Sequence, residues 1–205
     1  MQAFGVQSMQ GMDAALVLWL RGVVATHPLL ANAVLLLANV GIVLLVGALA
    51  LAYVWPGTDW LDRRRAVLAS LAAVALGLVL VELLGGLVAR PRPFVALRVP
   101  PLFPHASDSS FPSDHTLLGV ALATPLLMRR PRLGAPAFIL ALVVGVARVA
   151  SAVHYPSDVV GSAALGLGVG ALGLAGTPTL LSRLPDRLLD LAGLSGESGQ
   201  PGRSR

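Results

Sequence analysis

The chain has 205 residues, of which 56% are hydrophobic and 12% charged, and its mean hydropathy is +0.79. Soluble domains carry roughly 25% charged residues, so the composition excludes an ordinary soluble domain and indicates a membrane protein. The net charge of +5 comes from short arginine clusters between apolar stretches, so we expect no nucleic-acid partner. The absence of cysteine excludes disulfide bonds and thiolate metal sites.

Five apolar stretches are predicted to cross the membrane as helices, since a span needs about 20 apolar residues. In chain order they lie near residues 28–54, 66–89, 115–129, 133–150 and 158–181. The third and fourth are shorter than ideal, so we expect the polar motifs beside them to lie in a dent below the bilayer surface, covered by protein. The predicted fold class is an all-α, polytopic membrane helical bundle.

The segment at residues 12–26 precedes these spans and is the least regular of the apolar stretches. It contains Arg21 and is too short to cross the bilayer unaided, so it forms either an interfacial helix or a short sixth span. The bundle therefore has five or six predicted spans. Residues 1–192 are predicted to form a single membrane-embedded domain. Residues 193–205, rich in Gly, Ser, Pro and Arg, are predicted to be a disordered tail.

The arginines divide unequally between the two ends of the predicted bundle. The richer end would hold Arg63, Arg64, Arg65, Arg129, Arg130, Arg132, Arg183, Arg187, Arg203 and Arg205. The other end holds Arg90, Arg92, Arg98 and Arg148, each within or beside a polar motif. Cytoplasmic loops carry the excess of arginine in membrane proteins. The polar motifs are therefore expected on the extracytoplasmic face.

The first polar motif, Arg90-Pro-Arg-Pro93, ends the second predicted span. The planar guanidinium group binds phosphate oxygens in a bidentate manner, so Arg90 and Arg92 are candidate phosphate ligands. Anchoring at the membrane interface is an alternative role for Arg90. Glu82, about two helical turns earlier, is an intramembrane carboxylate, for which we expect an ion pair with a neighbouring arginine.

The second motif, Phe111-Pro-Ser-Asp-His115, leads into a predicted helix. Ser113 lies near the helix N-terminus, where free backbone N–H groups favour phosphate binding. His115, when protonated, can donate a proton to a leaving-group oxygen as general acid. A single histidine at a membrane edge is more often structural, but a second motif histidine on the same face favours the catalytic interpretation.

The third motif, Arg148-x5-His154-x3-Asp158, lies at a break between the last two spans, because Pro156 disfavours helix at the preceding residue. We predict that Asp158 hydrogen-bonds one ring nitrogen of His154, fixes its tautomer and leaves the other nitrogen free to attack phosphorus. Capping of the following helix is the alternative role for Asp158, and the two can coexist. Arg148 is a further candidate phosphate ligand.

The sequence predicts a site without a metal or a cofactor. The carboxylates are scattered, and the histidines lack a His-x-x-x-His or similar spacing. Arginines supply the positive charge that a metal would provide. Cations for phosphate oxygens, one nucleophilic imidazole and one acidic imidazole together indicate a membrane-embedded phosphatase.

The three motifs resemble the signature of the type 2 phosphatidic acid phosphatase superfamily, which vanadium haloperoxidases share: Lys-x6-Arg-Pro, then Pro-Ser-Gly-His, then Ser-Arg-x5-His-x3-Asp. The resemblance covers about residues 82–174. It implies phosphate binding by Arg92, Arg148 and Ser113, general acid catalysis by His115, a phosphohistidine intermediate on His154, and orientation of that ring by Asp158.

The chain departs from that signature at three positions: Gly85 replaces the lysine, Ala147 the serine, and Asp114 the glycine. The loss of the lysine removes one cation from the phosphate site. Either Arg90 or Arg98 replaces this cation, or the loss lowers activity. With Asp114 among the substrate-binding residues, the second motif is similar to bacterial undecaprenyl-diphosphate phosphatases of the bacitracin-resistance type. That similarity implies hydrolysis of the polyprenyl diphosphate carrier on the outer face of the bacterial plasma membrane, which returns the monophosphate to peptidoglycan synthesis.

Two alternative functions remain open. One is a lipid phosphatase acting on phosphatidic acid or phosphatidylglycerophosphate. The other is a catalytically weak lipid-binding or translocating protein, which Gly85 in the lysine position favours. Retention of both histidines and Asp158 favours an enzyme, because binding alone needs only the arginines. The apolar composition argues against a haloperoxidase, since those enzymes are soluble.

Overall fold

The computed structural model describes residues 2–55, 60–182, 185–192 and 194. Every regular element among these residues is a helix, so the predicted all-α class is confirmed. The helices are α1 (Gln2–Thr26), α2 (Pro28–Val54), α3 (Trp60–Val88), α4 (Pro93–Ala96), α5 (Asp114–Arg129), α6 (Pro131–Ala150), α7 (Pro156–Leu181) and α8 (Asp186–Leu191).

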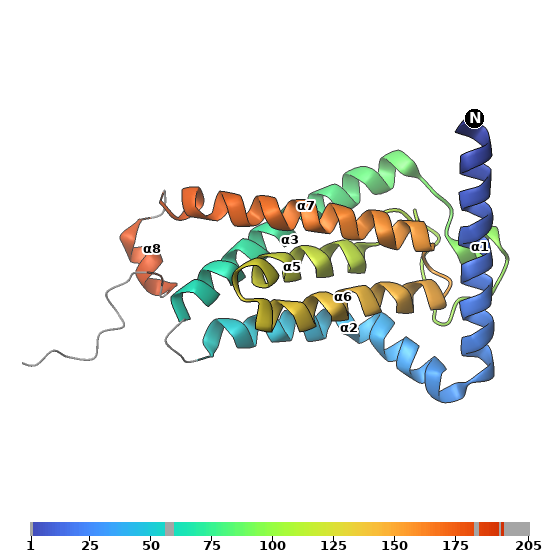
Figure 1. Cartoon of the computed structure of the whole chain (residues 1–205), viewed down its shortest axis with the longest axis horizontal. Coiled ribbons are helices and arrows are strands. Elements are labelled where there is room, and N and C mark those ends of the chain that lie inside the picture. The colour runs from blue at the N-terminus through green and yellow to red at the C-terminus, as the bar shows by residue number, and fades with distance from the viewer. Residues whose placement is uncertain (1, 56–59, 183–184, 193, 195–205) are drawn as a thin grey trace, which may run out of the picture.

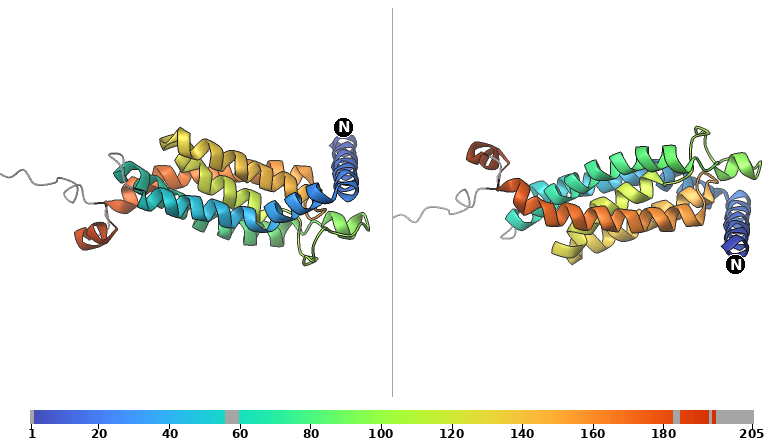
Figure 2. Two further views of the ribbon diagram at one scale, coloured as in Figure 1. Left: turned by 90° about the horizontal axis from the view of Figure 1, so that it is seen from below. Right: turned by 90° about the horizontal axis from the view of Figure 1, so that it is seen from above.

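Helices α2, α3, α5, α6 and α7 lie side by side as an elongated bundle (Figures 1 and 2). Of these, α2, α3, α6 and α7 are long and apolar enough to cross a membrane. Large apolar side chains on their outer faces are exposed, among them Leu36, Val43, Leu83, Ile139 and Val160. A bundle with an apolar exterior is suited to lipid surroundings, and the protein is a multi-pass membrane protein.

Helix α5 forms the centre of the bundle, where it contacts α3, α6 and α7. Most of its side chains from Thr116 to Leu126 are buried. Small residues on α7 allow the close approach: a Cβ atom added at Gly166 would lie 2.6 Å from the carbonyl oxygen of Leu117, and one added at Gly170 would lie 2.5 Å from the Cβ of Thr124. Tight helix packing through glycine is common in membrane proteins.

Helix α1 lies across one end of this bundle, roughly perpendicular to the other helices (Figures 1 and 2). Val17 and Val24 of α1 are buried against the bundle, whereas Trp19 of the same helix is 63% exposed. Arg21 donates from Nε to the carbonyl oxygen of Pro100 at 3.1 Å. The helix is longer than the predicted segment at residues 12–26, and its position across the bundle favours the interfacial interpretation.

We name the two ends of the bundle by their terminal helices. The α1 end carries the connections at residues 89–113 and 151–155, and the polar motifs lie in these connections and in the adjoining ends of α5, α6 and α7 (Figure 1). The α8 end carries the α5–α6 turn and α8, where the hydroxyl of Tyr53 donates to the carbonyl oxygen of Ala192 at 2.6 Å. Apart from Leu194, the predicted tail lies outside the described residues, as do Arg183, Arg203 and Arg205.

Candidate active site

His154 lies in the buried connection between α6 and α7. Pro156 occupies the first turn of α7, so the helix cannot extend backwards through Tyr155. Ala152 in the same connection has a φ of 59°, a region that favours glycine. This tight path places the His154 ring in the interior of the α1 end, where the residue has 0% exposure.

The hydrogen bonds of the His154 ring assign its tautomer. Nδ1 lies 2.7 Å from the carbonyl oxygen of Ser110. A carbonyl can only accept, so Nδ1 carries the proton. Nε2 lies 3.2 Å from Nη1 of Arg92, which can only donate, so Nε2 presents its lone pair. The nitrogen with the lone pair is therefore the one that faces the cationic part of the site.

Burial lowers the pKa of His154 well below its usual value of 6.5, and the positive charges of Arg148 and Arg92 lower it further. The nearby carboxylate of Asp114 acts in the opposite direction but does not outweigh them. The ring is therefore neutral near pH 7, which is the state that a nucleophilic imidazole requires.

A group of cationic and imidazole side chains surrounds the carboxylate of Asp114. Its Oδ1 lies 2.9 Å from Nδ1 of His115, 3.8 Å from Nε2 of His154 and 3.9 Å from Nη2 of Arg148. We call Arg92, Asp114, His115, Arg148 and His154 the anion cluster. The structure thus brings five of the eight predicted site residues together: His115, Arg148 and His154 around the carboxylate of Asp114, and Arg92 against His154.

The two arginines of the anion cluster are held by residues of the loop before α5. Arg92 is 4% exposed and donates from Nε to Asp108 at 2.9 Å. Although partial burial raises the pKa of Asp108, the hydrogen bond and charge of Arg92 lower it overall. Arg148 is 2% exposed and donates from Nη2 to Nε2 of His105 at 2.8 Å. Burial, with both arginines, lowers the pKa of His105, so its ring is a neutral acceptor.

Arg90 and Asp158 belong to a second set of contacts, which we call the anchor network and which also contains Asp13 and Ser157. Arg90 donates to Asp158 at 2.6 Å, to Asp13 at 2.7 Å and to the hydroxyl of Ser157 at 2.8 Å. Asp13 also accepts from the backbone N–H of Ser157 at 3.0 Å and from its hydroxyl. Burial opposes the charge on Arg90, but its two carboxylate partners raise its pKa overall. The anchor network thereby fixes α1 to the start of α7.

The structure differs from the sequence-based expectation in the partner of His154. Asp158 accepts from the backbone N–H of Tyr155 at 2.8 Å and from Arg90, whereas the carbonyl of Ser110 orients the His154 ring. The carboxylate of Asp158 caps the N-terminus of α7 through the N–H of Tyr155. The capping alternative therefore describes its contacts.

Three further residues have neighbours that differ from those predicted. Arg90 is bound by the carboxylates of the anchor network rather than facing the anion cluster. Glu82 is exposed on α3, and the expected ion pair with a neighbouring arginine is not formed among the described residues. Ser113 precedes the first turn of α5, with its hydroxyl 3.0 Å from that of Thr116 and its N–H donating to Ser162 at 2.7 Å.

Backbone contacts join the anchor network to the nucleophile candidate. Ser110 donates its N–H to the carbonyl oxygen of Arg90 at 2.8 Å, and the N–H of Arg90 donates to the hydroxyl of Ser109 at 3.2 Å. The carbonyl of Ser110 in turn accepts the Nδ1 proton of His154. The position of the His154 ring therefore depends on a chain of contacts that reaches Asp13 on α1.

Sequence reasoning missed Asp13, His105, Asp108 and Ser110 as site residues. For Asp13 a signal existed, because a single carboxylate in an apolar segment indicates a specific partner. His105 and Asp108 lie in an irregular loop, where spacing gives no register. Within the described residues, no group of three or more His, Asp or Glu side chains is arranged to hold a metal ion.

Similarity to known proteins covers the segment that contains the three polar motifs. The profile of the PAP2 superfamily matches residues 66–180. Undecaprenyl-diphosphatase BcrC of Bacillus subtilis (strain 168) is 38% identical over 125 residues, 61% of this chain and 64% of BcrC. The bacitracin transport permease protein BcrC of Bacillus licheniformis is 35% identical over 113 residues, 53% of this chain and 56% of that protein. The chain thus matches less than two thirds of the length of either relative.

The fold is similar to a solved crystal structure. Aquifex aeolicus LpxE superimposes with a TM-score of 0.68 and 29% sequence identity, over 80% of this chain and 95% of LpxE. The likeness therefore includes nearly the whole of that protein and most of the helical bundle described above.

Proposed function

The chain belongs to the PAP2 superfamily, whose profile matches more than half of its residues, and on this premise we propose that it is an integral-membrane phosphatase that hydrolyses undecaprenyl diphosphate to undecaprenyl phosphate. BcrC of Bacillus subtilis, which is 38% identical to this chain, is named an undecaprenyl-diphosphatase, and this supports the diphosphate as substrate. Residues 1–192 would form one catalytic domain.

The surroundings of Asp114 are the observation that carries this proposal. Arg148, His115 and His154 all lie within 4 Å of its carboxylate oxygen. A terminal phosphate is also a compact anion with several acceptor oxygens, so it suits the same donors. We infer that substrate phosphate takes the place of this carboxylate, and that Asp114 turns aside while it keeps its bond to His115.

In the first chemical step, Nε2 of His154 attacks the terminal phosphorus. The Nη1 donor of Arg92, which now bonds Nε2, turns to a phosphate oxygen and frees the lone pair. The carbonyl of Ser110 holds the Nδ1 proton and stabilises the charge that develops on the ring. Arg92 and Arg148 stabilise the negative charge on the phosphoryl oxygens.

The bond between the terminal phosphorus and the bridging oxygen breaks in the same step. The departing lipid phosphate takes the electron pair and receives a proton from His115. Nδ1 of His115 is bound to Asp114, so Nε2 is the nitrogen that delivers the proton. Water then attacks the phosphohistidine, His115 accepts a proton from that water, and inorganic phosphate leaves with His154 restored.

The site is proposed to face the extracytoplasmic side of a bacterial plasma membrane. The arginines of the α8 end support this orientation through the positive-inside rule. Substrate would reach the anion cluster from the outer leaflet, with the diphosphate at the α1 end and the polyprenyl chain along the apolar exterior of the bundle.

The test is phosphate release by purified protein in detergent with EDTA, measured on undecaprenyl diphosphate and phosphatidic acid beside His154→Ala. We expect EDTA-resistant release that strongly prefers the diphosphate and disappears in the variant. Preference for phosphatidic acid would retain the mechanism and change the substrate. No release by folded protein from any lipid phosphate tested would refute the enzyme assignment and favour a lipid-binding role.

A further inference from the structure

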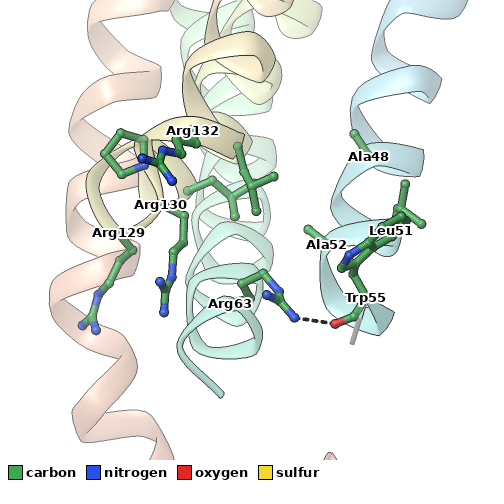
Figure 3. A pocket seen from close by; sticks show the side chains of 11 residues that line it. Ala48, Leu51, Ala52, Trp55, Arg63, Arg129, Arg130 and Arg132 are labelled. Atoms are coloured by element: carbon green, nitrogen blue, oxygen red, sulfur yellow. Dashed lines mark hydrogen bonds between the residues drawn. The ribbon is translucent and has the colours of Figure 1, made fainter. Parts of the chain in front are cut away.

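A cavity of about 850 Å³ lies at the α8 end, the opposite end of the bundle from the anion cluster. Four arginines line it: Arg63, Arg129, Arg130 and Arg132. Apolar side chains of α2, α5 and α6 complete the lining. Figure 3 shows the arginines of α3 and of the α5–α6 turn lying across from Leu51 of α2 and from Trp55, which follows α2. The cavity thus combines a cationic part with an apolar wall.

The charge in this cavity is strongly one-sided. No carboxylate occurs among the described residues that line it. Arg130 forms an ion pair with Asp62 at 2.8 Å, and Arg63 donates to the carbonyl oxygen of Trp55. Arg129 and Arg132 are exposed to the space around the turn, and Arg129 also lines a neighbouring cavity of about 230 Å³ between α3 and α7.

The length of α5 fixes the depth of these arginines in the membrane. The helix has 16 residues, so it spans about 24 Å between Asp114 in the candidate site and Arg129 at the cavity. The hydrocarbon core of a bilayer is about 30 Å thick. With the anion cluster near one surface, the α5–α6 turn lies just inside the opposite boundary of the hydrocarbon core, where a long arginine side chain can reach the lipid head groups. Arg129 and Arg132, which are exposed there, can therefore bind the phosphate of a lipid head group.

We propose that this cavity binds an anionic glycerophospholipid from the leaflet opposite the candidate active site. The phosphate lies among the arginines, where planar guanidinium groups bind its oxygens. One acyl chain lies against Leu51, Trp55 and Leu133, on the apolar wall. A volume of this size suits a head group with part of a chain. The site is separate from the proposed phosphatase site and does not depend on its activity.

The experiment measures phosphatidylglycerol binding to the full-length protein by native mass spectrometry, with phosphatidylcholine as the zwitterionic comparison. Arg129→Gln and Arg132→Gln each remove one cavity charge. Arg187→Gln is the matched control, because it removes an exposed arginine at the same end that does not line the cavity. Ala48→Trp fills the cavity without any change of charge. Thermal unfolding of each variant establishes that it is folded.

We expect the protein to bind phosphatidylglycerol more tightly than phosphatidylcholine. Removal of each cavity arginine should lower the affinity for phosphatidylglycerol about fivefold. Ala48→Trp should lower it comparably, and Arg187→Gln should leave it unchanged. Phosphate release at the α1 end stays normal in all four variants. Equal binding of the two lipids, or equal loss in Arg187→Gln, overturns the proposal in favour of a diffuse surface charge. Tighter binding of undecaprenyl phosphate than of phosphatidylglycerol overturns the glycerophospholipid assignment.

Discussion

At the scale of single residues, the state of His154 predicts the acidic limit of catalysis. Burial together with Arg148 and Arg92 lowers its pKa below 6.5. A lowered pKa means that the ring binds its second proton only at more acidic pH, so the nucleophile stays neutral down to that point. We expect the acidic limb of the kcat/KM profile to lie below pH 6.5. An acidic limb at or above this value would contradict the burial argument.

The role of His115 predicts a dependence on the leaving group. General acid catalysis contributes about 10²–10⁴-fold, so His115→Ala should lower kcat by that factor on a lipid phosphate with an alcohol leaving group, such as phosphatidic acid. A phosphate ester with an acidic leaving group, such as para-nitrophenyl phosphate, needs no proton and should lose much less. Rates on the two substrates are compared in wild type and variant; an equal loss on both would assign His115 a binding role instead.

Sequence motifs identified the residues of the anion cluster because the chemistry of phosphate transfer restricts their types and their spacing. They did not identify the partner of the His154 ring. That partner, the carbonyl of Ser110, is a backbone group 44 residues away, and any residue type could supply it. The proximity of Asp158 in sequence suggested a bond that helix geometry directs elsewhere, to the N-terminus of α7.

At the scale of helices, the docking of α1 includes one buried carboxylate, that of Asp13. Asp13→Asn keeps the shape of the side chain but removes its charge beside Arg90. We expect a loss of about 2 kcal/mol in stability, below that of a fully buried pair because the Arg90 side chain is 24% exposed. Thermal unfolding in detergent measures the change.

Asp62→Asn is the control for this prediction, because it breaks an ion pair to Arg130 in which the Asp62 side chain is 54% exposed. Its effect should stay within about 0.5 kcal/mol. An Asp13 variant that is no less stable than the control would mean that apolar contacts alone hold α1 in place. Phosphatase activity should also fall in the Asp13 variant, since the contacts reach His154.

The contact between α5 and α7 predicts opposite effects for two neighbouring glycines. An added Cβ at Gly166 would lie 2.6 Å from the backbone oxygen of Leu117, so Gly166→Ala should cost about 1–3 kcal/mol. At Gly168 nothing lies within 4 Å, so Gly168→Ala should be neutral or stabilise by up to about 1 kcal/mol. Apparent melting temperatures of the pair in one detergent test this; equal shifts would refute the packing described here.

At the scale of the whole molecule, the helical bundle could be predicted because the length and apolarity of each segment are local properties. The position of α1 could not, because it depends on contacts between residues 77 positions apart, Asp13 and Arg90. The count of five or six crossings stays a prediction, since α5 is short and α1 lies across the bundle.

The proposed orientation is tested by labelling single cysteines, which the natural chain lacks. Ser107→Cys lies in the exposed loop at the α1 end, and Ser182→Cys lies exposed at the α8 end. A membrane-impermeable maleimide added to intact cells should label the first and not the second, and permeabilised cells should show both. The reverse pattern would place the anion cluster in the cytoplasm.

The position of α1 also bears on how the protein is assembled during synthesis. In the proposed orientation, a polar segment that contains Asp13 and Arg21 has to be exported while α2 enters the bilayer. The arginines at the start of α3, Arg63–Arg65, would act as the retention signal that holds the next connection inside. Arg90 and Ser157 gain their contacts with Asp13 only once Asp13 has been exported. In that orientation the anchor network is completed on the outer side and not in the cytoplasm.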